Sequence, residues 1–412
     1  MVTSSVLDSA DTPVVALVDR IPVIDTDTHV SEPPDLWLSR LPTKWHDIAP
    51  RVVQLDTGPD GSSEDVWLIG DDPVASAWRM AMAGWEELSY KSHPWVQSQA
   101  DPASFDPVAR LTQMDEHGIS AQVLYPNLLA FYQGGLLRVG TPDFHVACVR
   151  AYNDFLSDFT AVAPQRYIPI AMLPFWDADA SVAEIERCAE MGHKGLLFSS
   201  APEKAGLPVL GDPYWNPVFG AAQAAGLSIN FHVAVGTIDK ELAESLEPGS
   251  GFKATPIEGV RGVVRSWLAN ANAIMEVILC GICDQFPELR FVSVESGYGY
   301  LPYLLDGLDW QWLNSGAKES HPGRLKPSEY FRRQMYATFW FEDETVKRLA
   351  DLYPDNLMFE SDFPHSTCLA PGPASYTDAP RVVLEDSFAG KLPDELLRKL
   401  LHDNAARVYN LG

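Results

Sequence analysis

The sequence has few basic residues, few cysteines and no long apolar run. Its 412 residues include 30 Lys and Arg against 56 Asp and Glu, which gives a formal net charge of −26 at pH 7. Nucleic acids and anionic membrane surfaces are bound by clustered cations, so the sequence predicts neither partner. No stretch reaches the roughly 20 apolar residues that a transmembrane helix needs. These absences favour a globular protein that acts on a small molecule.

The five cysteines are odd in number and too few for a disulfide scaffold. Residues 1–11 are polar and lack the basic and apolar pattern of a secretion signal. We therefore expect a reduced, cytoplasmic protein. Residues 1–19 show no hydrophobic periodicity, which predicts a flexible leader.

Eight short apolar runs alternate with longer amphipathic stretches over the rest of the chain. The runs cover residues 23–29, 121–125, 167–173, 195–198, 227–233, 291–295, 335–341 and 357–362. Helical patterns between them include residues 108–117, 142–162, 180–191 and 343–352. Strands that alternate with helices indicate βα units and a parallel sheet. Eight such units predict an α/β fold, a (β/α)8 TIM barrel over residues 20–412, with an open doubly wound sheet as the alternative.

The interval between the first two runs is much longer than a bare βα unit needs. Within it, residues 51–56 and 65–69 flank a Gly- and Pro-containing turn, which predicts a hairpin. A segment rich in tryptophan follows. We expect residues 46–105 to form a large insertion after strand 1, with the second part a lid over the catalytic face. A packed subdomain whose tryptophans are core residues is the alternative.

The first run carries Asp25, Asp27 and His29 at every second position. Side chains alternate across a strand, so all three are expected to face the barrel interior. Burial of three ionisable groups is costly unless something satisfies them, and a metal ion would do so. Hydrogen bonding of an acidic strand end to neighbouring loops is the alternative.

Three later runs also end in a potential ligand: His232, Glu295 and Asp362. Taken singly, they have structural interpretations as a core histidine, a helix cap and a turn residue. Together with His29, however, they place His, Asp or Glu at the carboxyl ends of four strands, where barrel enzymes have their active sites. The sequence therefore predicts an active site at this face.

Three motifs in this order resemble a known family: DTHVSEPPDLW at residues 27–37, ESG at 295–297 and SDFPH at 361–365. They are similar to the amidohydrolase-related (type 2) branch of the metal-dependent amidohydrolase superfamily, over about residues 21–410. This branch includes aminocarboxymuconate-semialdehyde decarboxylase and aromatic-acid decarboxylases. The resemblance implies a distorted barrel and a divalent metal, with Asp27, His29, His232 and Asp362 as ligands.

The chain departs from the family pattern at two ligand positions. Asp27 replaces the first histidine of the usual His-x-His, and Glu295 replaces a histidine that many members carry at the end of strand 6. The carboxylated lysine of binuclear members is also missing, since Lys194 lies at the opposite end of strand 4. A second metal would need Glu295, Asp25 or His365.

The full ligand set would combine three imidazoles with three carboxylates and no thiolate. Its members are Asp27, His29, His232, Glu295, Asp362 and His365. Such a set suits one or two ions of zinc, manganese or iron, and its carboxylates favour manganese or iron. A bound ion would supply a water nucleophile or polarise a substrate oxygen. We expect Asp362, Glu295 and His232 to be catalytic, with proton transfer by Glu295 or His365.

These features predict a metal-dependent enzyme that hydrolyses or non-oxidatively decarboxylates a small organic acid, such as an aromatic acid. Tyr298, Trp340 and Phe341 are expected to line the substrate pocket. The enzyme is expected to form a homo-oligomer. The same barrel also occurs in a diiron monooxygenase of platensimycin-type diterpenoid biosynthesis, so hydroxylation of an organic acid or thioester by two irons is the alternative. A non-catalytic barrel is disfavoured by intact ligand candidates on four strands.

Overall fold

The computed structural model describes residues 16–87, 92–235, 256–370, 372 and 377–411. Its centre is an eight-stranded sheet in the order β1-β5-β6-β7-β8-β9-β10-β11, in which all paired neighbours are parallel. The strands are β1 (Val23–His29), β5 (Ile119–Tyr125), β6 (Tyr167–Ala171), β7 (Gly195–Phe198), β8 (Ser228–His232), β9 (Phe291–Val294), β10 (Met335–Phe339) and β11 (Leu357–Phe359). Each coincides with one of the eight predicted runs.

The sheet closes on itself between β1 and the segment after β11. The Asp362 amide donates to the Asp27 carbonyl at 3.0 Å, and the His29 amide donates to the Phe363 carbonyl at 2.7 Å. Thr28 and Phe363 form an isolated parallel bridge. The fold is therefore a distorted (β/α)8 barrel, as predicted, and the open-sheet alternative is excluded.

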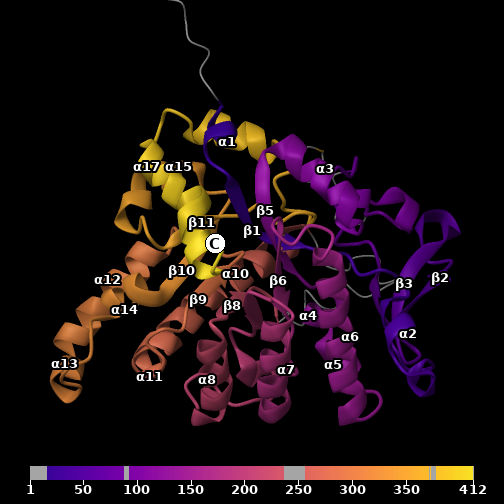
Figure 1. The fold of residues 1–412 in the computed structure, drawn as a ribbon, viewed down its shortest axis with the longest axis horizontal. Coiled ribbons are helices and arrows are strands. Elements are labelled where there is room, and N and C mark those ends of the chain that lie inside the picture. The colour runs from indigo at the N-terminus through magenta and orange to yellow at the C-terminus, as the bar shows by residue number, and fades with distance from the viewer. Residues whose placement is uncertain (1–15, 88–91, 236–255, 371, 373–376, 412) are drawn as a thin grey trace, which may run out of the picture.

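Helices surround the barrel, and Figure 1 shows α6, α7 and α8 side by side beneath the strands. The helices are α1 (Leu17–Arg20), α2 (Leu36–Arg40), α3 (Pro107–His117), α4 (Leu128–Phe131), α5 (Gln133–Leu137), α6 (Pro142–Thr160), α7 (Ala178–Glu190), α8 (Asn216–Ala225), α10 (Pro256–Leu279), α11 (Ile282–Gln285), α12 (Leu301–Asn314), α13 (Ala317–Ser320), α14 (Pro327–Gln334), α15 (Asp343–Leu349), α16 (Pro380–Val383), α17 (Asp394–Arg398) and α18 (Asn404–Val408). Strands β6 to β11 are buried at every position because helices cover the outside and side chains fill the inside.

Local sequence signals explain the ends of α3. The Asp106 carboxylate accepts hydrogen bonds from the amides of Val108 and Ala109, and Pro107 occupies the first turn, where an amide proton is not needed. Gly118 ends the helix with a φ of 73°, which favours glycine. The helix therefore matches the predicted range within one residue.

The predicted hairpin is present as β2 (Arg51–Leu55) and β3 (Glu64–Ile69), which pair antiparallel. A third strand, β4 (Asp72–Ser76), pairs with β3 and was not predicted. Its Pro73 resembles a turn residue in the sequence but is tolerated here because β4 is an edge strand. Figure 1 shows this small sheet beside the barrel.

The described structure begins at residue 16, before residue 20, where the barrel domain is predicted to begin. Leu17 and Val18 lie in α1 and are buried, and the Val18 amide donates to Glu385 at 3.1 Å. Apolar contacts therefore hold these two residues against the domain, whereas residues 1–15 lie outside the described part. Within the described residues, no helix combines the length and apolarity required to cross a membrane.

Candidate metal centre

Strand β1 directs the side chains of Asp25, Asp27 and His29 into the barrel. The two threonines between them face the neighbouring strands β11 and β5. Thr26 donates its hydroxyl to the Phe359 carbonyl at 2.8 Å, and Thr28 donates to the Val123 carbonyl at 2.8 Å. Asp27 and His29 alternate with them and are completely buried. The predicted period-two arrangement therefore places both at the carboxyl end of β1, inside the barrel.

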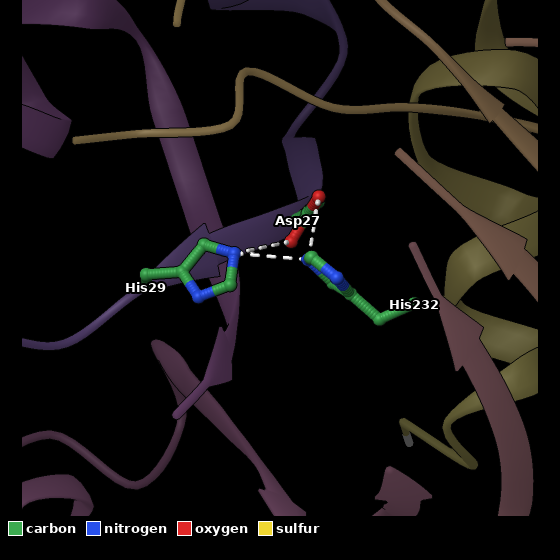
Figure 2. A group of neighbouring side chains, drawn as sticks. All are labelled: Asp27, His29 and His232. Atoms are coloured by element: carbon green, nitrogen blue, oxygen red, sulfur yellow. Dashed lines mark hydrogen bonds and ion pairs between the residues drawn. The ribbon is translucent and has the colours of Figure 1, made fainter. Parts of the chain in front are cut away.

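His29 and His232 point their Nε2 atoms at each other across 3.0 Å (Figure 2). The Nδ1 atom of His29 lies 3.2 Å from the Pro126 carbonyl, and the Nδ1 atom of His232 lies 2.9 Å from the Val233 carbonyl. Carbonyl oxygens only accept, so each Nδ1 carries the proton in the neutral ring. Two Nε2 lone pairs then face each other, an arrangement that a cation bound by both would stabilise.

Asp27 supplies the negative charge for such a cation. Its two carboxylate oxygens lie 3.5 Å from His29 Nε2 and 3.6 Å from His232 Nε2. Both oxygens are buried with no hydrogen-bond partner among the described residues. Buried carboxylate oxygens without partners are costly, and a divalent ion would satisfy them. The residues present therefore fit a metal ion.

Asp362 and His365 form the next part of the centre, in the loop after β11. His365 Nδ1 lies 2.9 Å from Asp362 Oδ1, and the His365 ring stacks on His29 with centroids 3.8 Å apart. The other oxygen of Asp362 accepts from the Thr367 hydroxyl at 2.7 Å. The loop thus brings a carboxylate and a third imidazole to the two histidines already described.

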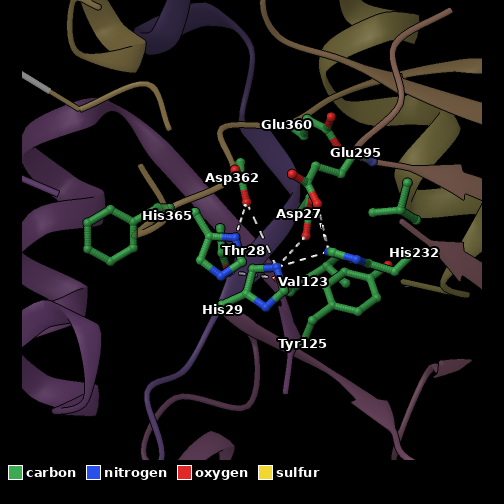
Figure 3. A network of polar contacts seen from close by, with 12 residues as sticks. Asp27, Thr28, His29, Val123, Tyr125, His232, Glu295, Glu360, Asp362 and His365 are labelled. Atoms are coloured by element: carbon green, nitrogen blue, oxygen red, sulfur yellow. Dashed lines mark hydrogen bonds and ion pairs between the residues drawn. The ribbon is translucent and has the colours of Figure 1, made fainter. Parts of the chain in front are cut away.

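Glu295 completes the predicted set, and Figure 3 shows the whole network. Its Oε2 lies 3.6 Å from His232 Nε2, and its backbone amide donates to the buried carboxylate of Glu360 at 3.3 Å. Burial, reinforced by the negative charge of Asp362, raises the pKa of Glu295 well above its usual value. Burial followed by the charge of Asp27 does the same to the pKa of Glu360. This crowding of carboxyl groups would be relieved by a cation.

Glu295 and Asp362 share an uncommon backbone conformation. Their φ angles are 53° and 57°, in the left-handed region that residues other than glycine rarely adopt. Such positions persist where the surrounding structure holds them, and they cluster at functional sites. Here both occur at strand ends where the carboxylates turn toward the histidines.

All six predicted ligands therefore come together. Three overlapping groups have ligand atoms within 4.8 Å of one another: Asp27, His29 and His232; His29, Asp362 and His365; and Asp27, Glu295 and Asp362. Asp25, considered as a further ligand, is instead bound to the β11 loop, because its carboxylate accepts from the amide and hydroxyl of Ser361 at 2.8 and 2.6 Å. It supports the loop that carries Asp362.

The three predicted pocket residues have different surroundings. Trp340 is buried and donates to the carbonyl of Thr367, the residue that binds Asp362. Phe341 is 49% exposed and stacks on Trp267 with centroids 4.8 Å apart. Tyr298 is buried against Phe339 in the apolar core, so its described contacts do not support a pocket role. Gly297, with a φ of 66°, turns the chain just before it.

Four contributors to the site were missed in the sequence. Glu360 precedes Asp362 by two residues, so strand alternation could have indicated it. Phe131 lies with its ring centroid 5.8 to 6.2 Å from those of His29, His232 and His365. Asn127 contacts His365, and Glu32 binds the backbone of Asn127. Glu32 lies within the motif at residues 27–37, but no local signal indicates its role or marks Phe131 and Asn127, because these roles depend on contacts between distant loops.

Comparison with known proteins agrees with this geometry. A family model described as amidohydrolase matches residues 24–411. The chain belongs to this family. It is 25% identical over 283 residues to a gamma-resorcylate decarboxylase of Rhodococcus jostii (strain RHA1), covering 66% of this chain and 80% of the relative. A gamma-resorcylate decarboxylase of Rhizobium sp. (strain MTP-10005) is 24% identical over 269 residues, covering 62% and 76%.

Solved structures of the same fold are similar over nearly the whole chain. An amidohydrolase of Mycobacterium avium subsp. paratuberculosis K-10 has a TM-score of 0.71 at 22% identity, covering 94% of this chain and 99% of that one. The 5-carboxyvanillate decarboxylase of Sphingomonas paucimobilis has a TM-score of 0.62 at 21% identity, covering 95% and 100%. A dihydroxybenzoic acid decarboxylase of Polaromonas sp. JS666, solved with bound manganese, has a TM-score of 0.57 at 18% identity, covering 95% and 97%.

These findings confirm the predicted amidohydrolase membership and the TIM barrel. The relatives described give no support to the diiron monooxygenase alternative.

Proposed function

We propose that the protein is a metal-dependent enzyme that decarboxylates an aromatic acid without an oxidant. The observation that carries the proposal is the pair of opposed Nε2 lone pairs on His29 and His232 beside the unpartnered oxygens of Asp27. This arrangement is suited to a divalent cation at the catalytic face of the barrel. The decarboxylase relatives favour decarboxylation over hydrolysis.

Manganese is the proposed metal, held by Asp27, His29, His232 and Asp362. Carboxylate and imidazole ligands suit this ion, and two similar aromatic-acid decarboxylase structures contain it. When bound, the ion would polarise a substrate oxygen and favour negative charge on the ring. Glu295 and His365 lie close enough to this position to contribute ligands to a second ion.

An aromatic substrate is proposed because the site contains the apolar ring of Phe131. Phe131 lies over the three histidines and offers a ring face to a planar acid. In decarboxylation the bond between the ring and the carboxylate breaks, carbon dioxide leaves, and the ring carbon takes up a proton. Glu295 and His365 are the groups beside the site that could hold that proton, and Asp362 is the carboxylate that could receive one from the substrate.

The test is release of carbon dioxide from a panel of aromatic acids. The protein, loaded with Mn²⁺, is incubated with hydroxybenzoates that carry a hydroxyl beside the carboxylate, and the ring product is measured by chromatography. We expect stoichiometric carbon dioxide and ring product from at least one of them, and none with His232→Ala. Hydrolysis of amides or esters with no loss of any carboxylate would contradict the proposal.

We also propose that residues 71–100 of the insertion, of which residues 88–91 lie outside the described part, act as a lid. The amides of Met82 and Ala83 donate to the Pro364 carbonyl at 2.7 and 3.0 Å, so this segment contacts the loop that carries Asp362 and His365. Its attachment beside the metal centre is what supports the proposal. The packed subdomain remains compatible with the burial of Trp78.

A homo-oligomer in the cytoplasm completes the proposal. Four apolar residues of α10 are exposed at intervals of three and four, namely Ile257, Val260, Val264 and Leu268, at 77%, 53%, 41% and 52%. An exposed apolar stripe on one helix supports contact with a second copy. The molar mass measured by light scattering should be a multiple of the 45.5 kDa chain, and should fall with Val264→Glu.

The five free cysteines suit a reducing compartment.

A further inference from the structure

His365 differs from the other two histidines in the nitrogen that it presents to the site. His29 and His232 direct Nε2 inward and bind backbone carbonyls through Nδ1. His365 directs Nδ1 to the Asp362 carboxylate at 2.9 Å, whereas its Nε2 lies 2.9 Å from Oδ1 of Asn127. The ring is 6% exposed, so its protein partners rather than water determine which nitrogen carries the proton.

Asn127 faces His365 with an acceptor. Its Nδ2 lies 3.4 Å from the Val30 carbonyl, to which only an amide nitrogen can donate, so the carbonyl oxygen of the side chain is the atom turned to His365. An oxygen acceptor requires a proton on His365 Nε2. The other ring nitrogen, Nδ1, then faces Asp362 Oδ1 at 2.9 Å, where either a proton or a bound ion must lie between the two atoms.

A buried carboxylate fixes Asn127 in this position. Oε1 of Glu32 accepts from the backbone amides of Asn127 and Leu128, both at 2.9 Å. Glu32 and Asn127 are 4% and 6% exposed. Asn127, the second residue after β5, is therefore held by two hydrogen bonds from its backbone segment to a buried carboxyl group, and its side chain has little freedom to rotate away from His365.

We propose that Asn127 is a positioning residue, held by Glu32, that keeps the proton on Nε2 of His365 and so presents Nδ1 to the reaction site. It acts through His365 and does not contact the other five ligand candidates by any bond described. The inference rests on the proposed function only for what Nδ1 does next, which is to bind the ion or to exchange a proton with the substrate. The proton on Nε2 follows from the hydrogen bond to Asn127 alone. Partners beyond the ligands commonly determine this state of a histidine at a metal centre.

The test is the tautomer of His365, measured by nitrogen-15 NMR on the full-length protein with labelled histidine. The signals of His365 are identified by their loss in His365→Gln, and spectra are recorded with and without Zn²⁺, which is diamagnetic. In the wild type we expect a protonated Nε2 in both spectra. In Asn127→Leu, which has a similar size but no acceptor, we expect that proton to leave Nε2 in a substantial fraction of molecules.

A conservative variant separates positioning from a general loss of structure. Asn127→Asp keeps an oxygen acceptor at the same place, so it should retain the protonated Nε2, whereas Asn127→Leu should not. Zn²⁺ affinity or turnover should fall about 10- to 100-fold in Asn127→Leu, the usual range for such partners, and recover at least in part in Asn127→Asp. A protonated Nε2 that persists in folded Asn127→Leu would overturn the inference, as would its loss in Asn127→Asp. Because NMR needs no substrate, failure of the decarboxylase assay would leave this result interpretable.

Discussion

At the scale of single residues, the centre depends on groups that are unsatisfied without an ion. The Nε2 atoms of His29 and His232 oppose each other, and both oxygens of Asp27 lack a partner among the described residues. Removal of one imidazole should remove metal affinity while sparing the fold, because the ring lies at a strand end and not in the apolar core.

His232→Ala should therefore lose bound metal and activity but retain its circular dichroism spectrum. One coordinate bond is lost, and the remaining ligands are too few for tight binding. Metal content is measured by mass spectrometry after dialysis. His321→Ala, which alters an exposed histidine in the loop after α13, is the matched control. Full metal occupancy in His232→Ala would remove this residue from the ligand set.

Glu295→Gln distinguishes a proton donor from a ligand. Without an ion, burial and the charges of Asp362, Asp27 and Glu360 raise the pKa of Glu295. With one ion bound, we expect Glu295 still to hold a proton. Loss of that donor should lower turnover roughly a hundredfold with metal content unchanged. If Glu295 binds a second ion, the variant should lose about one metal equivalent per chain. Full metal and full activity together would show that Glu295 is structural.

The ligands could be predicted because two general rules apply to them. Alternation along β1 selects Asp27 and His29, and the strand ends of a barrel meet at one face, which brings in His232, Glu295 and Asp362. Asn127 and Phe131 obey no such rule, because the loop after β5 reaches a loop that lies 238 positions away in sequence. Tyr298 lies beside Phe339 in the apolar core, after the turn at Gly297, and strand periodicity does not reveal that turn.

At the scale of elements, the barrel follows from the sequence and the insertion follows only in part. The eight barrel strands could be predicted because apolar runs mark them, and β2 and β3 could be predicted because a turn separates them. The edge strand β4 could not be predicted, since Asp72 and Pro73 are residues typical of a loop. Tertiary contacts determine the position of the insertion. The Arg110 guanidinium in α3 donates to the carbonyl of Ala103, at the end of the insertion, and to the carbonyl of His29, at the end of β1.

If residues 71–100 form a lid, ligand should protect them from protease. The contacts of Met82 and Ala83 with Pro364 would be strengthened when substrate occupies the site below. Limited proteolysis with and without the product of the decarboxylation, followed by mass spectrometry, locates the cuts. Slower cleavage within this range, with unchanged cleavage elsewhere, is expected. Equal rates at saturating product would leave the packed subdomain as the correct description.

At the scale of the whole molecule, buried carboxyl groups make the stability of the metal-free protein depend on pH. Burial raises the pKa of Asp25 from 3.8 to about 7, and the pKa of Glu32 and Glu342 from 4.5 to about 7. Between about pH 5 and about pH 7 these groups are ionised in the unfolded chain but largely protonated in the folded one. The folded state then binds more protons, so the free energy of unfolding falls as the pH rises through 7.

Urea unfolding of the metal-free protein at about pH 6.5 and about pH 8 measures this effect. Buried histidines, whose pKa values are lowered, act in the opposite direction, and their effect fades as the pH rises above their unfolded pKa of about 6.5. We expect a lower midpoint at the higher pH, and a smaller difference in Glu342→Gln. This variant keeps an acceptor for the amides of Tyr298 and Gly299. A midpoint that rises between the two pH values would show that these carboxyl groups are ionised in the folded state.

The most direct measurement of the central claim is anomalous X-ray diffraction from crystals of the protein loaded with Mn²⁺. The account predicts a strong anomalous peak bounded by Nε2 of His29, Nε2 of His232 and the carboxylate of Asp27, with Asp362 completing the shell. The peak should vanish in crystals of His232→Ala prepared in the same way. Wild-type crystals that bind Mn²⁺ only elsewhere, or not at all, would contradict the assignment of this cluster as the metal centre.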